Sequence, residues 1–133
     1  MEVVLALTIA GMLATLAVPY FRPGIGAGAL RARASEIAGL LRRDRNLALH
    51  LQRRSAVLVD AGGGAIRSGL LDETIVMPNG ISLKLLPESA PGVVFQPDGS
   101  SSGARIVLAA RQSSIAVDVN RLTAAIRISE AKP

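Results

Sequence analysis

Side chains that commonly perform chemistry are scarce in this 133-residue sequence. His50 is the only histidine and there is no cysteine, so neither a paired-histidine mechanism nor a thiolate metal site is available. The motifs G-x-S-x-G, G-x-x-x-x-G-K-[ST] and H-E-x-x-H do not occur. His50 is expected to be structural, because a histidine near a helix C-terminus is favourable there without a further role. The sequence therefore predicts a non-enzymatic protein with no catalytic residue and no cofactor.

Among the scattered carboxylates, Asp98 stands in a distinctive segment that reads FQPDGSSSG over residues 95–103. Its small residues allow unusual backbone angles, and its hydroxyl and carboxylate oxygens could contribute to a calcium site. Calcium prefers several oxygen ligands, however, and one aspartate supplies few. The better interpretation is a hairpin loop between two strands, without a metal.

Glu2 is the most informative single residue, because it precedes the uncharged apolar run of residues 3–18. Sixteen helical residues span roughly 24 Å, short of the roughly 30 Å hydrocarbon core, and Tyr20 and Phe21 extend the segment to a plausible interfacial edge. An acidic side chain costs about 2.5–3.5 kcal/mol at the centre of a membrane helix and less near its edge, so such a residue is normally paired. Either a neighbouring subunit's amino terminus pairs with Glu2, or Glu2 lies in the headgroup region without a role.

Prolines and glycines interrupt the chain after this segment, which indicates a kink at Pro19 and a break over residues 22–28. A second helix is predicted over residues 29–52, because its apolar residues recur every three or four positions with Asp44 as the one break. These positions are Leu30, Ala34, Ile37, Leu41, Ala48 and Leu51. The stripe is expected to pack on the protein's own sheet or, in a sharper interpretation, on a partner helix.

From Ser55 onward the pattern changes to short apolar runs with a period near two, separated by glycine and proline turns. The close spacing of the last four runs predicts an antiparallel meander. One long helix laid on this sheet gives an α+β domain. The candidate strands are residues 56–60, 81–86, 93–96, 105–110, 114–119 and 122–128.

The formal charge of +5 is concentrated in residues 31–54, which contain seven arginines and only two acidic residues, Glu36 and Asp44. The formal charges of the rest of the chain sum to zero. A basic segment of this kind could meet anionic lipid, nucleic acid or an acidic protein face. It could equally be the solvated face of a helix whose arginines lie near lipid.

The pattern of Glu2, the apolar run with Gly11, and Pro19 seventeen residues later resembles the N-terminal helix of type IV pilins and type II secretion pseudopilins. Residues 94–108, with Phe95, Pro97, Asp98, Gly99 and Gly103, closely resemble the late hairpin of the general secretion pathway protein H subfamily. Residues 119–126 look like its closing strand, and Ala124 stands where that subfamily often has glycine in Leu-Thr-Gly.

The resemblance implies a minor pseudopilin of the type II secretion system, with a pilin-like α+β fold. It implies an assembly helix over residues 1–21 in the inner membrane and a periplasmic domain over residues 29–133, with its sheet over residues 55–128. Partners would be other major and minor pseudopilins, inner-membrane lipid and the inner-membrane secretion platform. Glu2 would pair with a neighbouring subunit's amino terminus, and Pro19 would kink the helix.

Such subunits are made as prepilins, cleaved after a glycine and N-methylated. We therefore expect a short basic leader upstream of Met1. Arginines that follow the apolar segment, with none before it, agree with such a missing leader. The alternative is a minor pilin of a type IV pilus that binds DNA, suggested by the net charge and by Arg121, Arg127 and Lys132; nucleic acid is thus a less favoured partner.

Overall fold

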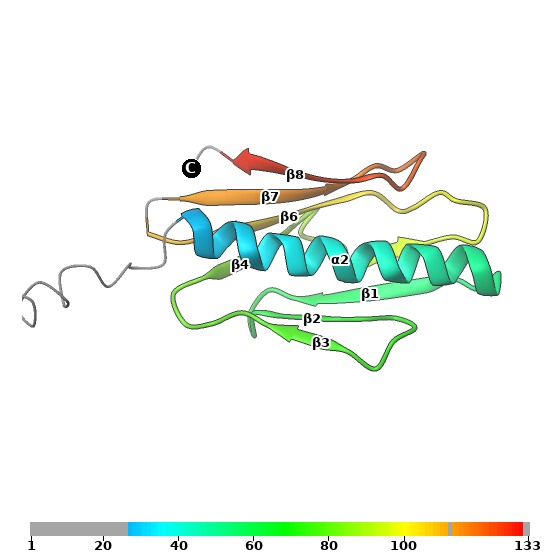
Figure 1. Cartoon of the computed structure of the whole chain (residues 1–133), viewed down its shortest axis with the longest axis horizontal. Helices are drawn as coiled ribbons and strands as arrows, with labels where there is room; N and C mark the ends of the chain where they lie inside the picture. The colour runs from blue at the N-terminus through cyan, green and yellow to red at the C-terminus, as the bar shows by residue number, and fades with distance from the viewer. Residues whose placement is uncertain (1–26, 112, 132–133) are drawn as a thin grey trace, which may run out of the picture.

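The computed structural model describes residues 27–111 and 113–131, which form one long helix and eight short strands (Figure 1). The predicted assembly helix, with Glu2 and Pro19, lies outside the described residues. The elements are α2 (Ala27–Leu51), β1 (Ser55–Asp60), β2 (Ala65–Arg67), β3 (Thr74–Val76), β4 (Ser82–Leu86), β5 (Gly92–Phe95), β6 (Ala104–Ala109), β7 (Ser114–Val119) and β8 (Ile126–Ala131).

Helix α2 is rich in alanine, leucine and arginine, which are strong helix formers. It begins at Ala27, inside the interruption predicted for residues 22–28. Its end is a left-handed cap, because Gln52 has a φ of 52° and the N–H of Arg53 donates to the carbonyl of Ala48 at 3.1 Å. No helix within residues 27–111 and 113–131 is long and apolar enough to cross a membrane.

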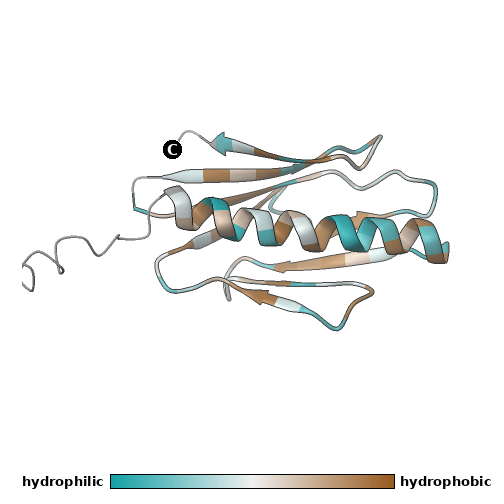
Figure 2. Ribbon diagram, viewed as in Figure 1, coloured by the Kyte–Doolittle hydropathy of each residue, from teal (hydrophilic) through white to brown (hydrophobic). Residues whose placement is uncertain are grey.

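The buried stripe of α2 follows the predicted spacing, but one predicted residue is exposed and two further residues are buried. Figure 2 shows that hydrophobic and hydrophilic residues are interspersed along this helix. Leu51, predicted to belong to the stripe, is 48% exposed, because it lies in the last turn where the helix runs past the core. Ala38 and Leu40, which the pattern did not include, are fully buried. The stripe therefore covers a wider arc than one narrow seam. Its fully or almost fully buried apolar members are Leu30, Ala34, Ile37, Ala38, Leu40, Leu41 and Ala48.

The strands form two four-stranded antiparallel sheets, with the orders β3-β2-β1-β5 and β4-β6-β7-β8. The predicted meander of the last four strands is wrong for β5, which pairs with β1, while β6, β7 and β8 do form a meander. Strands β2 and β3 were not predicted, since three residues each are too short to show alternation. Residues 122–125, predicted as the start of the last strand, lie before β8.

Helix α2 lies along both sheets and contacts β1 and β5 of one and β6, β7 and β8 of the other (Figure 1). Alternate strand residues point to it, as Val57, Ile106 and Val117 do, and their neighbours point away. Phe95 is the largest of the fully buried side chains, in a core that is otherwise aliphatic. The predicted α+β, pilin-like class is confirmed for the described residues.

Asp44, the one polar residue in the apolar stripe, is fully buried. Its Oδ1 accepts a hydrogen bond from the hydroxyl of Ser68 at 2.7 Å, and its Oδ2 accepts one from the N–H of Gly69 at 2.9 Å. The same hydroxyl accepts from the N–H of Leu71 at 2.8 Å. Asp44 therefore fixes the loop between β2 and β3 to the helix, since a buried carboxylate must be hydrogen-bonded.

We expect Asp44→Ala to lower the free energy of unfolding by about 2 kcal/mol, because it leaves the buried Ser68 hydroxyl and the Gly69 N–H without their acceptor. Urea denaturation followed by circular dichroism measures the change. Asp72→Ala is the matched control: Asp72 is exposed, so its loss should stay within about 0.5 kcal/mol. Equal stability of the two variants would contradict this role.

Candidate functional site

The segment predicted as a hairpin, residues 96–103, joins strands of different sheets. β5 ends at Phe95 in the first sheet and β6 begins at Ala104 in the second, so the two flanking strands do not pair with each other as a hairpin. The loop itself does turn back as predicted, since the N–H of Gln96 donates to the carbonyl of Ser100 at 2.9 Å. Phe95 is buried in the core, and a single bridge pairs it with Ser101. Pro97 is half-buried and Asp98 is exposed.

Two serines tie this connection to both sheets. The N–H of Ser101 donates to the carbonyl of Arg121 at 2.9 Å, and its hydroxyl donates to the carbonyl of Asn120 at 2.7 Å. The N–H of Ser102 donates to the carbonyl of Val94 at 2.9 Å, while its hydroxyl accepts from the N–H of Val94 at 3.0 Å. The serine oxygens thus bond to the backbone, where they take the place of strand pairing.

Gly99 and Gly103 are required by the backbone of the connection. Their φ angles are 93° and 72°, in the region that side chains other than glycine's disfavour. A Cβ on Gly103 would also lie 3.1 Å from the Cβ of Arg121. The glycines therefore set the path by which the chain changes sheets.

Asp98 shapes the tip of the same connection. Its Oδ1 accepts hydrogen bonds from the hydroxyl of Ser100 at 2.7 Å and from the N–H of Ser100 at 3.0 Å. These two bonds hold the pKa of the Asp98 carboxyl below its ordinary value, and the bond from the Ser100 hydroxyl has the larger effect. Within residues 27–111 and 113–131, no three His, Cys, Asp or Glu side chains gather where they could hold a metal ion.

The turn between β7 and β8 meets this connection and shows why glycine would suit the position of Ala124 in the closing motif. The Oδ1 of Asn120 accepts from the N–H groups of Leu122 at 2.8 Å and Thr123 at 3.0 Å. Ala124 then adopts a φ of 55°, a left-handed conformation in which glycine carries no steric penalty. Ala124 is fully buried, so its methyl group is enclosed by the core.

Most of the arginines of the basic helix bind within the domain. Arg42 donates to the carbonyl of Ile126 at 3.1 Å, and Arg45 donates to that of Ala124 at 3.3 Å. Two further arginines on this helix pair with acids far along the chain, at distances of 3.0 Å and 3.7 Å, and a third pairs within the helix at 3.1 Å. These pairs are Arg43–Glu73, Arg31–Glu130 and Arg33–Glu36.

Arg53 and Arg54 follow the end of α2 and are exposed. They are the members of the basic cluster that lack a side-chain hydrogen bond or ion pair within the described part of the chain. His50 is exposed beside them. The basic segment is therefore chiefly a structural element that holds β8 and the β2–β3 loop, although its exposed pairs stabilise only weakly.

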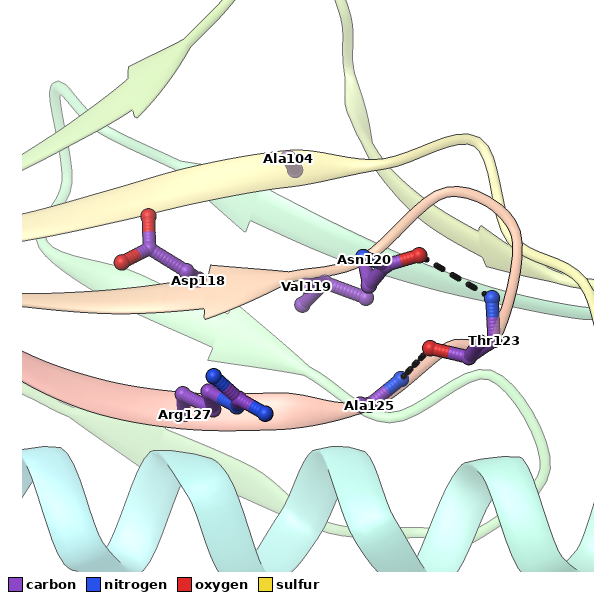
Figure 3. Close-up of a pocket in the computed structure, with 7 residues that line it drawn as sticks. All are labelled: Ala104, Asp118, Val119, Asn120, Thr123, Ala125 and Arg127. Carbon is purple, nitrogen blue, oxygen red and sulfur yellow. Dashed lines mark hydrogen bonds between the residues drawn. The ribbon is translucent and has the colours of Figure 1, made fainter.

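A groove of about 510 Å³ lies at the end of the second sheet, beside β7, β8 and the turn between them (Figure 3). Asp118 and Arg127 occupy opposed positions in the β7–β8 register, and Asn120 and Thr123 line the turn side. From the sequence, Arg127 was considered only as one of the positive charges near the C-terminus. The groove itself could not be predicted, because it depends on the register of two strands and on the turn.

A long helix laid along two antiparallel sheets defines the pilin-like fold, and solved structures of pilin-like subunits share it. The minor pseudopilin EpsH from the type 2 secretion system of Vibrio cholerae matches with a TM-score of 0.65 at 12% sequence identity, over 76% of this chain and 96% of that chain. The type IV minor pilin FimU of Pseudomonas aeruginosa matches with a TM-score of 0.62 at 13% identity, over 83% of this chain and 93% of that chain. GspH of E. coli matches with a TM-score of 0.59 at 13% identity, over 84% of this chain and 95% of that chain.

These likenesses confirm the sequence resemblance to minor pseudopilins at the level of the fold. The three neighbours are pilin or pseudopilin subunits rather than enzymes. No protein-family profile and no curated protein sequence matches the chain.

We expect Gly103→Ala to destabilise the domain by about 1–2 kcal/mol, because alanine is strained at a φ of 72° and its Cβ would press on Arg121. Gly39→Ala is a control of opposite sign. Gly39 lies within α2, and an added Cβ there would meet no other part of the fold within 4 Å, so alanine should stabilise by about 0.5–1 kcal/mol. Thermal unfolding measures both, and a stabilised Gly103→Ala variant would refute the account of the connection.

Ser100→Ala should raise the pKa of Asp98 partway towards its ordinary value, because one of the two bonds to the carboxylate is lost. Since the folded pKa is lowered, these bonds stabilise the fold above the ordinary pKa and are lost as the pH falls through the lowered value. A carbon-detected NMR titration of the Asp98 carboxyl measures the shift. The exposed Ser89→Ala should leave it unchanged, and an unaltered titration in Ser100→Ala would disprove the assigned cause.

Proposed function

We propose that this protein is a minor pseudopilin, a structural subunit of the pseudopilus by which the type II secretion system exports proteins across the outer membrane. The observation that carries the proposal is the fold: the domain matches EpsH and GspH over nearly the whole of their chains. The spacing of Glu2 and Pro19 around an apolar run, outside the described residues, supports it independently.

In this proposal the apolar run anchors the subunit in the inner membrane and the domain of α2 and the two sheets lies in the periplasm. Glu2 pairs with the amino terminus of a neighbouring pseudopilin, because an opposite charge offsets the cost of a carboxylate at the edge of a membrane helix. Pro19 kinks the helix that joins anchor and domain. Partners are the other major and minor pseudopilins, inner-membrane lipid and the secretion platform.

A second candidate is a minor pilin of a type IV pilus, which the match to FimU favours to a similar degree. Both candidates place the domain in a filament and differ in the machine that assembles it. The structure gives less support to the version in which the basic helix binds DNA, since most of its arginines are engaged within the domain.

Glu2→Ala in the full-length gene tests the proposal. We expect incorporation into the pseudopilus to fall about tenfold or more, because the loss of a membrane-embedded ion pair need exceed only about 1.4 kcal/mol to do so. Incorporation is measured by quantitative immunoblotting of sheared filaments, and secretion and surface piliation are assayed in the same strains. A secretion defect supports the pseudopilin, and a piliation defect supports the minor pilin.

Glu88→Ala is the matched control, since Glu88 is an exposed acid of the sheet domain whose ion pair with Lys84 is of the weak surface type. Its incorporation should equal that of the wild type. Unchanged incorporation of Glu2→Ala would remove the assembly role of Glu2, and absence of the wild-type protein from both kinds of filament would overturn the proposed function.

A further inference from the structure

We infer that the groove at the end of the second sheet binds an acidic side chain of a neighbouring pilin-like subunit, with Arg127 as its principal contact. This inference rests on the proposed function, because the neighbouring subunit of the filament supplies the acid. The groove lies in a different part of the molecule from Glu2, so the inference about the groove and the proposed role of Glu2 can be tested separately.

Three charged residues stand in a row across β6, β7 and β8, where Arg105, Asp118 and Arg127 occupy directly opposed positions. They point away from the core, because Val117 and Val119, on either side of Asp118, are buried. The row therefore lies on the outer face of the second sheet, where a neighbouring molecule can reach it.

Asp118 is already engaged and leaves Arg127 unpaired. Its Oδ1 lies 3.5 Å from the Nε of Arg105, and its Oδ2 accepts from the hydroxyl of Ser129 at 3.0 Å. Within the described residues, no carboxylate lies within ion-pair distance of Arg127, whose side chain is exposed. Arg127 thus presents a planar set of N–H donors suited to a carboxylate.

The other side of the groove adds polar hydrogens. The Oδ1 of Asn120 is occupied by two backbone N–H groups, so its amide NH₂ remains to donate. The hydroxyl of Thr123 accepts from the N–H of Ala125 at 3.3 Å and keeps its own hydrogen. Figure 3 shows these side chains on the turn and Arg127 on the neighbouring strand, lining one groove. Donors prevail over acceptors there, as an acidic ligand requires.

The charges favour one carboxylate over a nucleic acid. The formal charge at this end of the sheet is only +2, because three arginines stand there with Asp118: Arg105, Arg121 and Arg127. A duplex presents a continuous row of phosphates, and the carboxylate of Asp118 within the groove would repel them. A single acidic side chain brings only one charge to Arg127 and therefore meets less of this repulsion.

A second groove, of about 390 Å³ on the first sheet, shows the contrast. There Arg67 shares the lining with Asp60 and Asp72, so that groove contains its own acids. Arg67 is exposed like Arg127 and also stands on a strand, β2. It therefore serves as the matched control for substitutions of Arg127.

The binding test uses the full-length chain in detergent micelles, with acetyl-tetraglutamate amide as the probe and the tetraglutamine peptide as its neutral counterpart. We expect the acidic peptide to shift the NMR signals of Asn120, Thr123 and Arg127, and the neutral peptide to shift none. Arg127→Ala should weaken the acidic peptide at least fivefold, and Arg67→Ala should not. Absence of these shifts, or equal affinity in Arg127→Ala, would overturn the inference, and so would tighter, salt-sensitive binding of a 12-base-pair DNA at the same signals.

The cellular test asks whether a neighbouring subunit is the occupant. Incorporation of Arg127→Glu into filaments should fall at least fivefold, while Arg67→Glu should be incorporated as the wild type. Circular dichroism of the purified variants verifies folding. If the wild type is incorporated and Arg127→Glu is incorporated equally, the inference fails while the proposed function stands; if the wild type is not incorporated, the proposed function fails and the inference fails with it.

Discussion

The arrangement of this domain depends on one helix face that must fit two sheets at once. The sheets have no strand in common, and α2 lies along both of them. Small residues such as Ala34, Ala38 and Ala48 allow the backbone of the helix to come close, and larger ones such as Leu40 and Leu41 fill the space between strands. Because both sheets use the same face, displacement of the helix would expose the buried faces of both sheets together.

The helix also carries the polar contacts that fix the periphery. Asp44 and Arg43, adjacent in the chain, hold the loop between β2 and β3 from within and from the surface. Arg42 and Arg45 reach the second sheet, where they bind carbonyls at the start of β8 and just before it. In the sequence alone, this basic segment could suggest a surface that binds a polyanion. In the structure, most of its arginines instead bind backbone carbonyls and acidic side chains that are distant in sequence.

Sequence patterns predicted the elements better than their partners. The three-four spacing of Leu30, Ala34, Ile37 and Leu41 was enough to place the helix, because burial of one face follows directly from that period. Asp44 looked like a break, since its partners at Ser68 and Gly69 become neighbours only after folding. The strands on either side of residues 96–103 looked like partners for a similar reason: spacing along the chain does not reveal which strand will pair with β5. Sequence patterns could not predict the groove beside Arg127, because its chemistry comes from the strand register, which sets Asp118 between two arginines.

At Ala124 the sequence marked the position and the structure supplied the reason. The resemblance to a Leu-Thr-Gly motif singled out this residue, and its left-handed φ explains why glycine would suit the position.

The hydrogen bond from Arg42 to Ile126 has a consequence for how copies of such a domain can meet. β8 pairs with β7 on one side only, and strands at the border of a sheet can recruit foreign strands through their unpaired backbone groups. At Ile126 the guanidinium of Arg42 occupies the carbonyl, and a foreign strand would have to displace it. The helix thereby shields one end of this border from continuous, amyloid-like sheet growth, and leaves encounters there to side chains, which can be selective.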